Sequence, residues 1–157
     1  MQRLSGLVVL ATATALLAGG CTDGKTSPTP VAPVRVTVVQ NPTFAGGIAI
    51  FSLKVENVSQ SVVDLTFPSS CQVLPYFFER STGREVTPLG GGFVCLTVIT
   101  GQSLRPTESF VRTYSVRPGS APDPQYIVLP PGEYSIRARL EDTVYRLNSD
   151  PLAFTVQ

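Results

Sequence analysis

The sequence contains no histidine. Histidine is the commonest general base and the commonest metal ligand in proteins, so its absence excludes Ser/His and Cys/His nucleophile pairs and imidazole metal sites. The acidic residues Glu141, Asp142 and Asp150 lack the spacing of a known calcium loop, which favours a solvated strand end. We therefore expect a protein that is not an enzyme, with no catalytic residue, no metal and no cofactor.

Charge is also scarce. Charged residues make up 15% of the chain, and the 12 basic side chains nearly balance the 11 acidic ones. Such a balance gives no indication of a nucleic-acid partner. Hydrophobic residues make up 43% of the 157 positions, which is ample for one buried core.

Cysteine occurs only three times, and the first cysteine follows a typical export leader. Arg3 supplies a positive charge, residues 4–17 form an apolar run enriched in leucine, valine and alanine, and small residues precede Cys21. This order resembles a bacterial lipoprotein signal, in which residues 1–20 are removed and Cys21 is acylated. A plain signal peptide with a chance cysteine is the alternative. The apolar run is too short for a stable membrane span, so we expect membrane attachment through the lipid alone.

Residues 21–33 form a spacer rich in proline, threonine and serine, a composition that suits a semi-extended tether. Acylation of Cys21 leaves Cys71 and Cys95 as a pair in an oxidising compartment, so we expect a disulfide between them. In the loop-entropy model a bond of this span contributes on the order of 3 kcal/mol. In lipoproteins of two-membrane bacteria, an aspartate directly after the acylated cysteine signals retention at the inner membrane. By resemblance to these proteins, Thr22 in that position favours the outer membrane of a bacterial cell envelope.

Strands with a period of two dominate residues 34–157, and the stretch from Ile48 to Cys71 is the clearest example. Apolar and polar residues alternate in FSLKVE and again in VDLTF, with a polar turn between them. We expect these two arms to pair as a hairpin and the rest of the chain to supply a covering sheet. Residues 93–99 should bring Cys95 back toward Cys71, and residues 103–107 should be a connection.

Seven to nine short strands separated by turns predict an all-β fold, an antiparallel immunoglobulin-like β-sandwich, with a closed barrel as the alternative. The strand from Tyr134 to Leu140 alternates most regularly. Tyr134 follows a Pro-Gly turn, where sandwich folds place a corner tyrosine whose hydroxyl bonds to upstream backbone. Arg112 shares a face with apolar residues, which indicates a sheet edge or a partly open face.

Three segments, FSLKVENVSQSVVDLTFPSSCQ, FFERSTGREV and LPPGEYSIRARL, together resemble the BsuPI-type proteinase inhibitor domain. The resemblance covers roughly residues 51–140 and rests on four matching pairs: Asn57 and Ser59, Leu65 and Phe67, Gly83 and Val86, and Gly132 and Tyr134. It implies an immunoglobulin-like fold and a serine proteinase as the protein partner. The chain departs from the family pattern by lacking tryptophan, and the cysteine pair suits an exported relative.

The prolyl segment 117–131 is the candidate partner-binding loop, and its candidate binding residues are Pro118, Pro122, Asp123, Pro124 and Gln125. Proline lowers the entropy lost when a loop docks, although a plain crossing between sheets is the alternative. The triplet Gly90, Gly91 and Gly92 either admits the close approach of a partner or is simply a loose connection. We expect a monomeric envelope proteinase inhibitor, or alternatively a non-inhibitory immunoglobulin-like binding or assembly module.

Overall fold

The computed structural model describes residues 32–40 and 47–157. The chain divides into two units, Met1–Pro30 and Val31–Gln157, and only the second contains described residues. The predicted signal peptide (1–20), Cys21 and all of the 21–33 tether except its last two residues lie outside the described residues. The Pro33 carbonyl accepts a hydrogen bond from the Val58 N–H (2.9 Å), so the chain is already fixed to the domain there.

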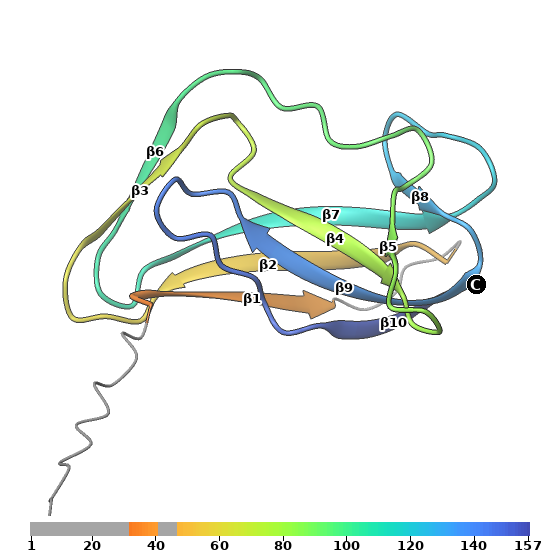
Figure 1. Ribbon diagram of the computed structural model, residues 1–157, viewed down its shortest axis with the longest axis horizontal. Coiled ribbons are helices and arrows are strands. Elements are labelled where there is room, and N and C mark those ends of the chain that lie inside the picture. Colours follow the sequence, from red (N-terminus) through yellow and green to blue (C-terminus); the bar gives the residue numbers. More distant parts are fainter. Residues whose placement is uncertain (1–31, 41–46) are drawn as a thin grey trace, which may run out of the picture. The chain divides into compact units, whose positions relative to one another are not determined.

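The described residues form ten strands and no helix, one strand more than the upper bound expected from the sequence (Figure 1). Two four-stranded sheets have the orders β1–β2–β7–β8 and β10–β9–β4–β5, and β3 pairs with β6 in a separate ribbon. The predicted all-β sandwich is confirmed, and every pairing except the short β7–β8 contact is antiparallel. The strands are β1 (Val34–Gln40), β2 (Ala49–Asn57), β3 (Val63–Phe67), β4 (Val73–Glu79), β5 (Glu85–Val86), β6 (Thr100–Leu104), β7 (Ser109–Pro118), β8 (Ile127–Leu129), β9 (Gly132–Leu140) and β10 (Leu152–Val156).

The core lies between the two four-stranded sheets and is built from the inward positions of alternating strands. In β2 every second side chain is buried, and β9 shows the same alternation from Tyr134 to Leu140. The Phe154 ring of β10 lies edge-on to Phe51 (4.8 Å between centroids) and to Phe77 (6.1 Å), so it joins both sheets. Burying one such aliphatic or aromatic side chain stabilises the fold by about 1.5–3 kcal/mol.

The predicted hairpin from Ile48 to Cys71 is wrong. Its first arm is β2, which pairs with β1 and β7, whereas its second arm is β3, which pairs with β6 in the ribbon. Both arms have the expected burial pattern, so the alternation was correct and the pairing was not.

Asn57 explains why the chain does not fold back along β2. Its side chain is fully buried and donates to the carbonyls of Ser61 (2.7 Å) and Leu104 (2.8 Å). Its Oδ1 also accepts the Ser59 N–H at 2.8 Å. These bonds fix the end of β2 to the turn and to the end of β6, and β3 therefore leaves in the direction of the ribbon. The connection expected at residues 103–107 is likewise shorter, because β6 extends to Leu104 and the turn follows it.

Asp142 is not at a solvated strand end, as the sequence suggested, because only 2% of its surface is exposed. Its carboxylate accepts backbone N–H groups of Thr66 (2.6 Å), Val144 (2.9 Å) and Tyr145 (2.7 Å). A carboxylate with three such donors links the connection after β9 to β3 of the ribbon.

Tyr134 forms the corner that its position after the Pro-Gly turn indicated. Its hydroxyl donates to the Pro130 carbonyl at 2.9 Å. A Cβ at Gly132 would lie 3.2 Å from the Tyr134 ring, so glycine allows the ring to fold back over the start of β9. The described residues contain no helix that is both long and apolar enough to cross a bilayer.

Candidate protein-binding site

One side of the sandwich is open between β7 and β4. The β7 strand pairs with β8 only at Val116, Arg117 and Pro118, so residues 109–115 have no neighbouring strand on that side among the described residues. The β4 strand pairs with β5 only at Phe77 and Phe78. The expectation that Arg112 marks an edge agrees with this arrangement. Residues 87–99, here called the covering loop, pass over the open side (Figure 1).

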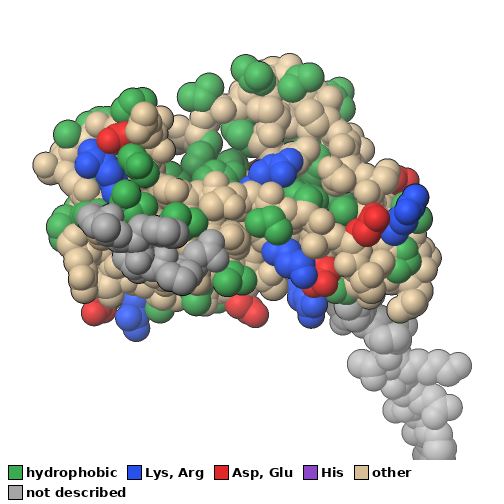
Figure 2. All heavy atoms as spheres, turned by 180° about the vertical axis from the view of Figure 1, so that it is seen from behind, with side chains coloured by type: hydrophobic (Ala, Val, Ile, Leu, Met, Phe, Trp, Pro, Cys, Tyr) green, Lys and Arg blue, Asp and Glu red, His purple; other side chains and the backbone are tan. Residues whose placement is uncertain are grey.

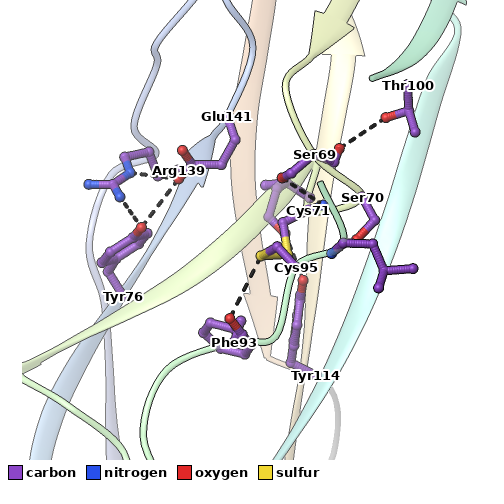
Figure 3. The surroundings of a disulfide bond; sticks show 12 residues. Ser69, Ser70, Cys71, Tyr76, Phe93, Cys95, Thr100, Tyr114, Arg139 and Glu141 are labelled. Atoms are coloured by element: carbon purple, nitrogen blue, oxygen red, sulfur yellow. Dashed lines mark hydrogen bonds and ion pairs between the residues drawn. A yellow bond between two sulfur atoms is a disulfide. The ribbon is translucent and has the colours of Figure 1, made fainter. Parts of the chain in front are cut away.

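The covering loop is held by a covalent bond and by hydrogen bonds (Figure 3). The predicted disulfide joins Cys95 in the loop to Cys71, with 5.4 Å between the Cα atoms. Next to it the Ser70 N–H donates to the Leu96 carbonyl (3.0 Å), and the Leu96 N–H donates to the Ser70 Oγ (2.9 Å). The loop backbone is therefore fixed at residues 95 and 96.

An aromatic contact joins the covering loop to β7 on the open side. The Phe93 ring lies edge-on to Tyr114 of β7, with 5.5 Å between ring centroids. The Tyr114 hydroxyl donates across to the Val73 carbonyl of β4 at 2.7 Å. Burial raises the pKa of Tyr114 above its usual 10.0, and the positive charge of Arg112 partly offsets this rise.

Above these anchors the loop exposes a row of apolar side chains, here called the crest: Val94, Leu96, Val98 and Ile99. Val94 is 93% exposed, Ile99 78% and Leu96 68%. Figure 2 shows hydrophobic side chains gathered along the upper margin of the face that it presents. Single exposed hydrophobic residues are ordinary, but four within six positions of one anchored loop are typical of an interaction site.

A groove of about 460 Å³ lies beside the crest. The first half of the covering loop forms one wall, residues 123–127 form the other, and Thr113, Tyr114 and Ser115 of β7 line it between them. The structure therefore brings the predicted residues Asp123, Pro124 and Gln125 together with the triplet Gly90, Gly91 and Gly92.

The remaining predicted loop residues have structural roles. Pro118 is the last residue of β7, so the loop proper begins after it. Pro122 lies so close to Gly90 that a Cβ on this glycine would be 3.2 Å from the proline Cβ. The Asp123 carboxylate forms an ion pair with Arg117 (3.1 Å) and accepts the Gln125 N–H (2.8 Å). The prolyl segment carries the chain through β8 from one sheet to the other, as the alternative interpretation held.

On the outer face of the β4–β9 pair, arginine side chains cover aromatic rings. Arg139 lies over the Tyr76 ring at 3.8 Å from its centroid, and Arg137 lies over Phe78 at 5.6 Å. The Arg139 Nε also pairs with Glu141 at 2.8 Å (Figure 3). These rings are occupied within the domain. In residues 32–40 and 47–157 no three acidic or cysteine side chains are grouped so that they could hold a metal ion.

The crest was missed in the sequence. Residues 93–99 alternate between apolar and polar types only weakly, and the pattern predicts no more than the return of the chain to the disulfide. The sequence feature that could indicate the crest is the apolar run directly after the glycine triplet. A run that follows such a flexible segment need not join a sheet, and its side chains can stay exposed.

No family model and no curated protein matches this chain. Among solved structures it is similar to a β-glucosidase from Erythrobacter marinus, with 13% identity, a TM-score of 0.41 and coverage of 79% of this chain. It is also similar to a β-glucosidase from Listeria innocua in complex with isofagomine (12% identity, TM-score 0.37, 79% of this chain) and to a β-D-glucoside glucohydrolase from Trichoderma reesei (16%, 0.34, 78%). The chain spans 15%, 16% and 18% of the lengths of these three enzymes. At these TM-scores the likeness defines neither a shared fold nor a shared function.

Proposed function

We propose that this protein is a lipid-anchored domain of the bacterial cell envelope that binds a protein partner through the crest. The observation that carries the proposal is the exposure of four apolar side chains on a loop whose backbone is fixed by the Cys71–Cys95 disulfide and by Ser70. A loop fixed before binding loses less conformational entropy when it docks. Burial of each large apolar side chain adds about 1.5–3 kcal/mol to the association.

Inhibition of a serine proteinase is the specific form of this function that the resemblance to the BsuPI-type domain supports. An inhibitor must offer an extended segment that remains intact in the proteinase cleft. The segment before Leu96 is the better candidate, because its backbone is anchored at residues 95 and 96. In the prolyl loop, by contrast, Pro118 belongs to a strand and Asp123 is ion-paired. A non-inhibitory binding or assembly module is the second candidate, because the crest also suits a flat apolar partner surface.

The crest is tested with the double variant Val94→Ser, Leu96→Ser. Both side chains are exposed, so the fold should be retained. Val144→Ser is the matched control, because Val144 is 74% exposed and lies outside the crest. The purified protein is titrated against a panel of serine proteinases while cleavage of its loops is followed.

Inhibition without turnover that is lost in the double variant and kept in the control supports the inhibitor. The assembly module is supported by two results together. No proteinase in the panel is inhibited, and a cross-linked envelope partner is lost in the double variant but kept in Val144→Ser. If the double variant and Val144→Ser behave alike in both assays, the crest is not the binding site.

The envelope location rests on the N-terminal pattern that ends at Cys21, and it has a separate test. Replacing Cys21 with alanine removes the thiol to which the lipid is attached. We expect the Cys21→Ala variant to accumulate with its leader uncut and without acyl groups, as measured by mass spectrometry of membrane fractions. Normal processing of this variant to a soluble protein would contradict the lipid anchor.

A further inference from the structure

We propose that the groove beside β7 binds an extended, uncharged peptide segment of a partner, which adds as a strand to the β1–β2–β7–β8 sheet. This inference goes beyond the proposed function, because it assigns a second binding element in addition to the crest. That element is the free edge of β7.

The first argument is the position of β8. This strand occupies the place beside β7 for only three residues, where Val116, Arg117 and Pro118 pair with Ile127, Val128 and Leu129. Continued along β7, the same place is the groove next to Thr113 and Ser115. The sheet therefore has a strand position that the described residues fill at one end and leave empty at the other (Figure 1).

The second argument is the direction of the backbone groups. The Gly119 N–H donates to the Leu129 carbonyl (3.1 Å), so the odd-numbered residues of this segment direct their backbone groups toward β8. Because successive residues of a strand point their N–H and C=O groups to opposite sides, Thr113 and Ser115 direct theirs into the groove. The Val111 carbonyl agrees with this alternation, since it accepts the Arg112 guanidinium (3.1 Å) on the same free side.

The third argument is the lining of the groove. Its wall includes Gly90, Gly91 and Gly92, which carry no side chain to occupy the space. Asp123 is the only charged residue in the lining, and its carboxylate is already paired with Arg117. A bound strand therefore meets no unpaired charge and is held mainly by backbone hydrogen bonds, with selectivity for neutral side chains that point toward the groove walls.

The test uses a capped peptide of alternating valine and threonine with a lysine at each end for solubility. Strand addition depends on the peptide backbone and is tolerant of sequence, so a generic strand-forming probe is sufficient. We expect it to slow hydrogen exchange at the Thr113 and Ser115 amides, measured by NMR. The same peptide with alternate backbone nitrogens methylated should not bind.

Thr113→Pro removes an N–H that points into the groove and that the β2–β7 ladder does not use, and it should weaken binding at least tenfold. Thr113→Val keeps this N–H and serves as the control. Gly92→Leu is an independent variant, because a Cβ at Gly92 meets no atom within 4 Å and the added side chain should occupy the groove. It should weaken binding even if Thr113→Pro does not fold.

Absence of protection at Thr113 and Ser115 at millimolar peptide would overturn the proposal. Equal affinity of the Thr113→Pro and Thr113→Val variants, or of the methylated peptide, would also overturn it. A second crest variant, Leu96→Ser, Ile99→Ser, changes two exposed crest side chains that do not line the groove, and it should bind the peptide as well as the unmodified protein does. Loss of peptide binding in that variant would assign the peptide to the crest and reject the groove.

Discussion

The hydroxyl of Tyr114 on β7 donates a hydrogen bond to the backbone carbonyl of Val73 on β4, with 2.7 Å between the two oxygen atoms. This bond joins the two sheets on the side where neither strand has a full neighbour. Because Phe93 of the covering loop packs on the same ring, the bond also supports the base of the candidate binding site.

We expect Tyr114→Phe to lower the free energy of unfolding by about 1 kcal/mol at neutral pH, the usual contribution of one hydrogen bond. Because burial raises the pKa of Tyr114 in the folded state, its contribution is complete below the unfolded value near 10.0 and is lost as pH rises through the folded value. Urea unfolding from about pH 9 to about pH 11 should therefore show a steeper loss of stability in the unmodified protein than in Tyr114→Phe. Equal slopes would contradict the assignment.

Removing the disulfide should destabilise the domain and release the covering loop. The double variant Cys71→Ser, Cys95→Ser opens a loop with a sequence separation of 24, which corresponds to a loss on the order of 3 kcal/mol. Urea unfolding measures the loss, and limited proteolysis should show new cleavage within residues 87–99. Treating the unmodified protein with a reductant is the control and should reproduce both effects. An intact loop in the double variant would mean that Ser70 and Phe93 suffice to hold it.

Asn57→Ala should lower the free energy of unfolding more than removal of an exposed asparagine. The variant leaves the buried Leu104 carbonyl without its donor, and each such group costs about 1–3 kcal/mol. Asn148→Ala is the matched control, since Asn148 is exposed and surface changes usually stay within about 0.5 kcal/mol. Thermal unfolding of the two variants compares them directly, and equal melting temperatures would refute the role of Asn57.

Two positions in β9 allow the stability contribution of a hydrogen bond to be compared with that of core packing. Tyr134→Phe removes the bond to the Pro130 carbonyl and should cost about 1 kcal/mol. Ile136→Ala opens a cavity at a fully buried position between the sheets and should cost roughly 2–5 kcal/mol. Urea unfolding measures both, and a smaller loss for Ile136→Ala than for Tyr134→Phe would be inconsistent with the packing described.

Strand positions and burial were largely predictable from the sequence, because side chains of one strand alternate between core and solvent. The alternation in β2 and in β9 identified the buried side chains correctly. It could not identify which strands pair, since β2 and β3 carry the same period and yet belong to different sheets. The information that separates them lies in Asn57, whose long-range bond to Leu104 has no signature in local sequence.

The candidate site was predictable only in part. The disulfide followed from the cysteine count, and Asp123, Pro124 and Gln125 of the prolyl segment line the groove, while their role in partner binding stays a prediction. The crest was not predictable, because an apolar residue such as Val94 is ordinarily expected in the core. Asp142 was misassigned for the converse reason, since an acidic residue after a strand is ordinarily solvated.

The pairing of β1 has a mechanical consequence. All seven residues of β1 pair with β2, from Val34 opposite Asn57 to Gln40 opposite Phe51, and the chain enters this ladder at Pro33. Thr113 pairs with Ser52, close to the far end of the same ladder, so tension between Pro33 and a partner held in the groove runs along the strand axis. Such tension strains the hydrogen bonds of β1 together instead of one after another. Under the proposed attachment at Cys21 and the proposed binding in the groove, a pull on the partner would therefore load all seven residues of β1 at once.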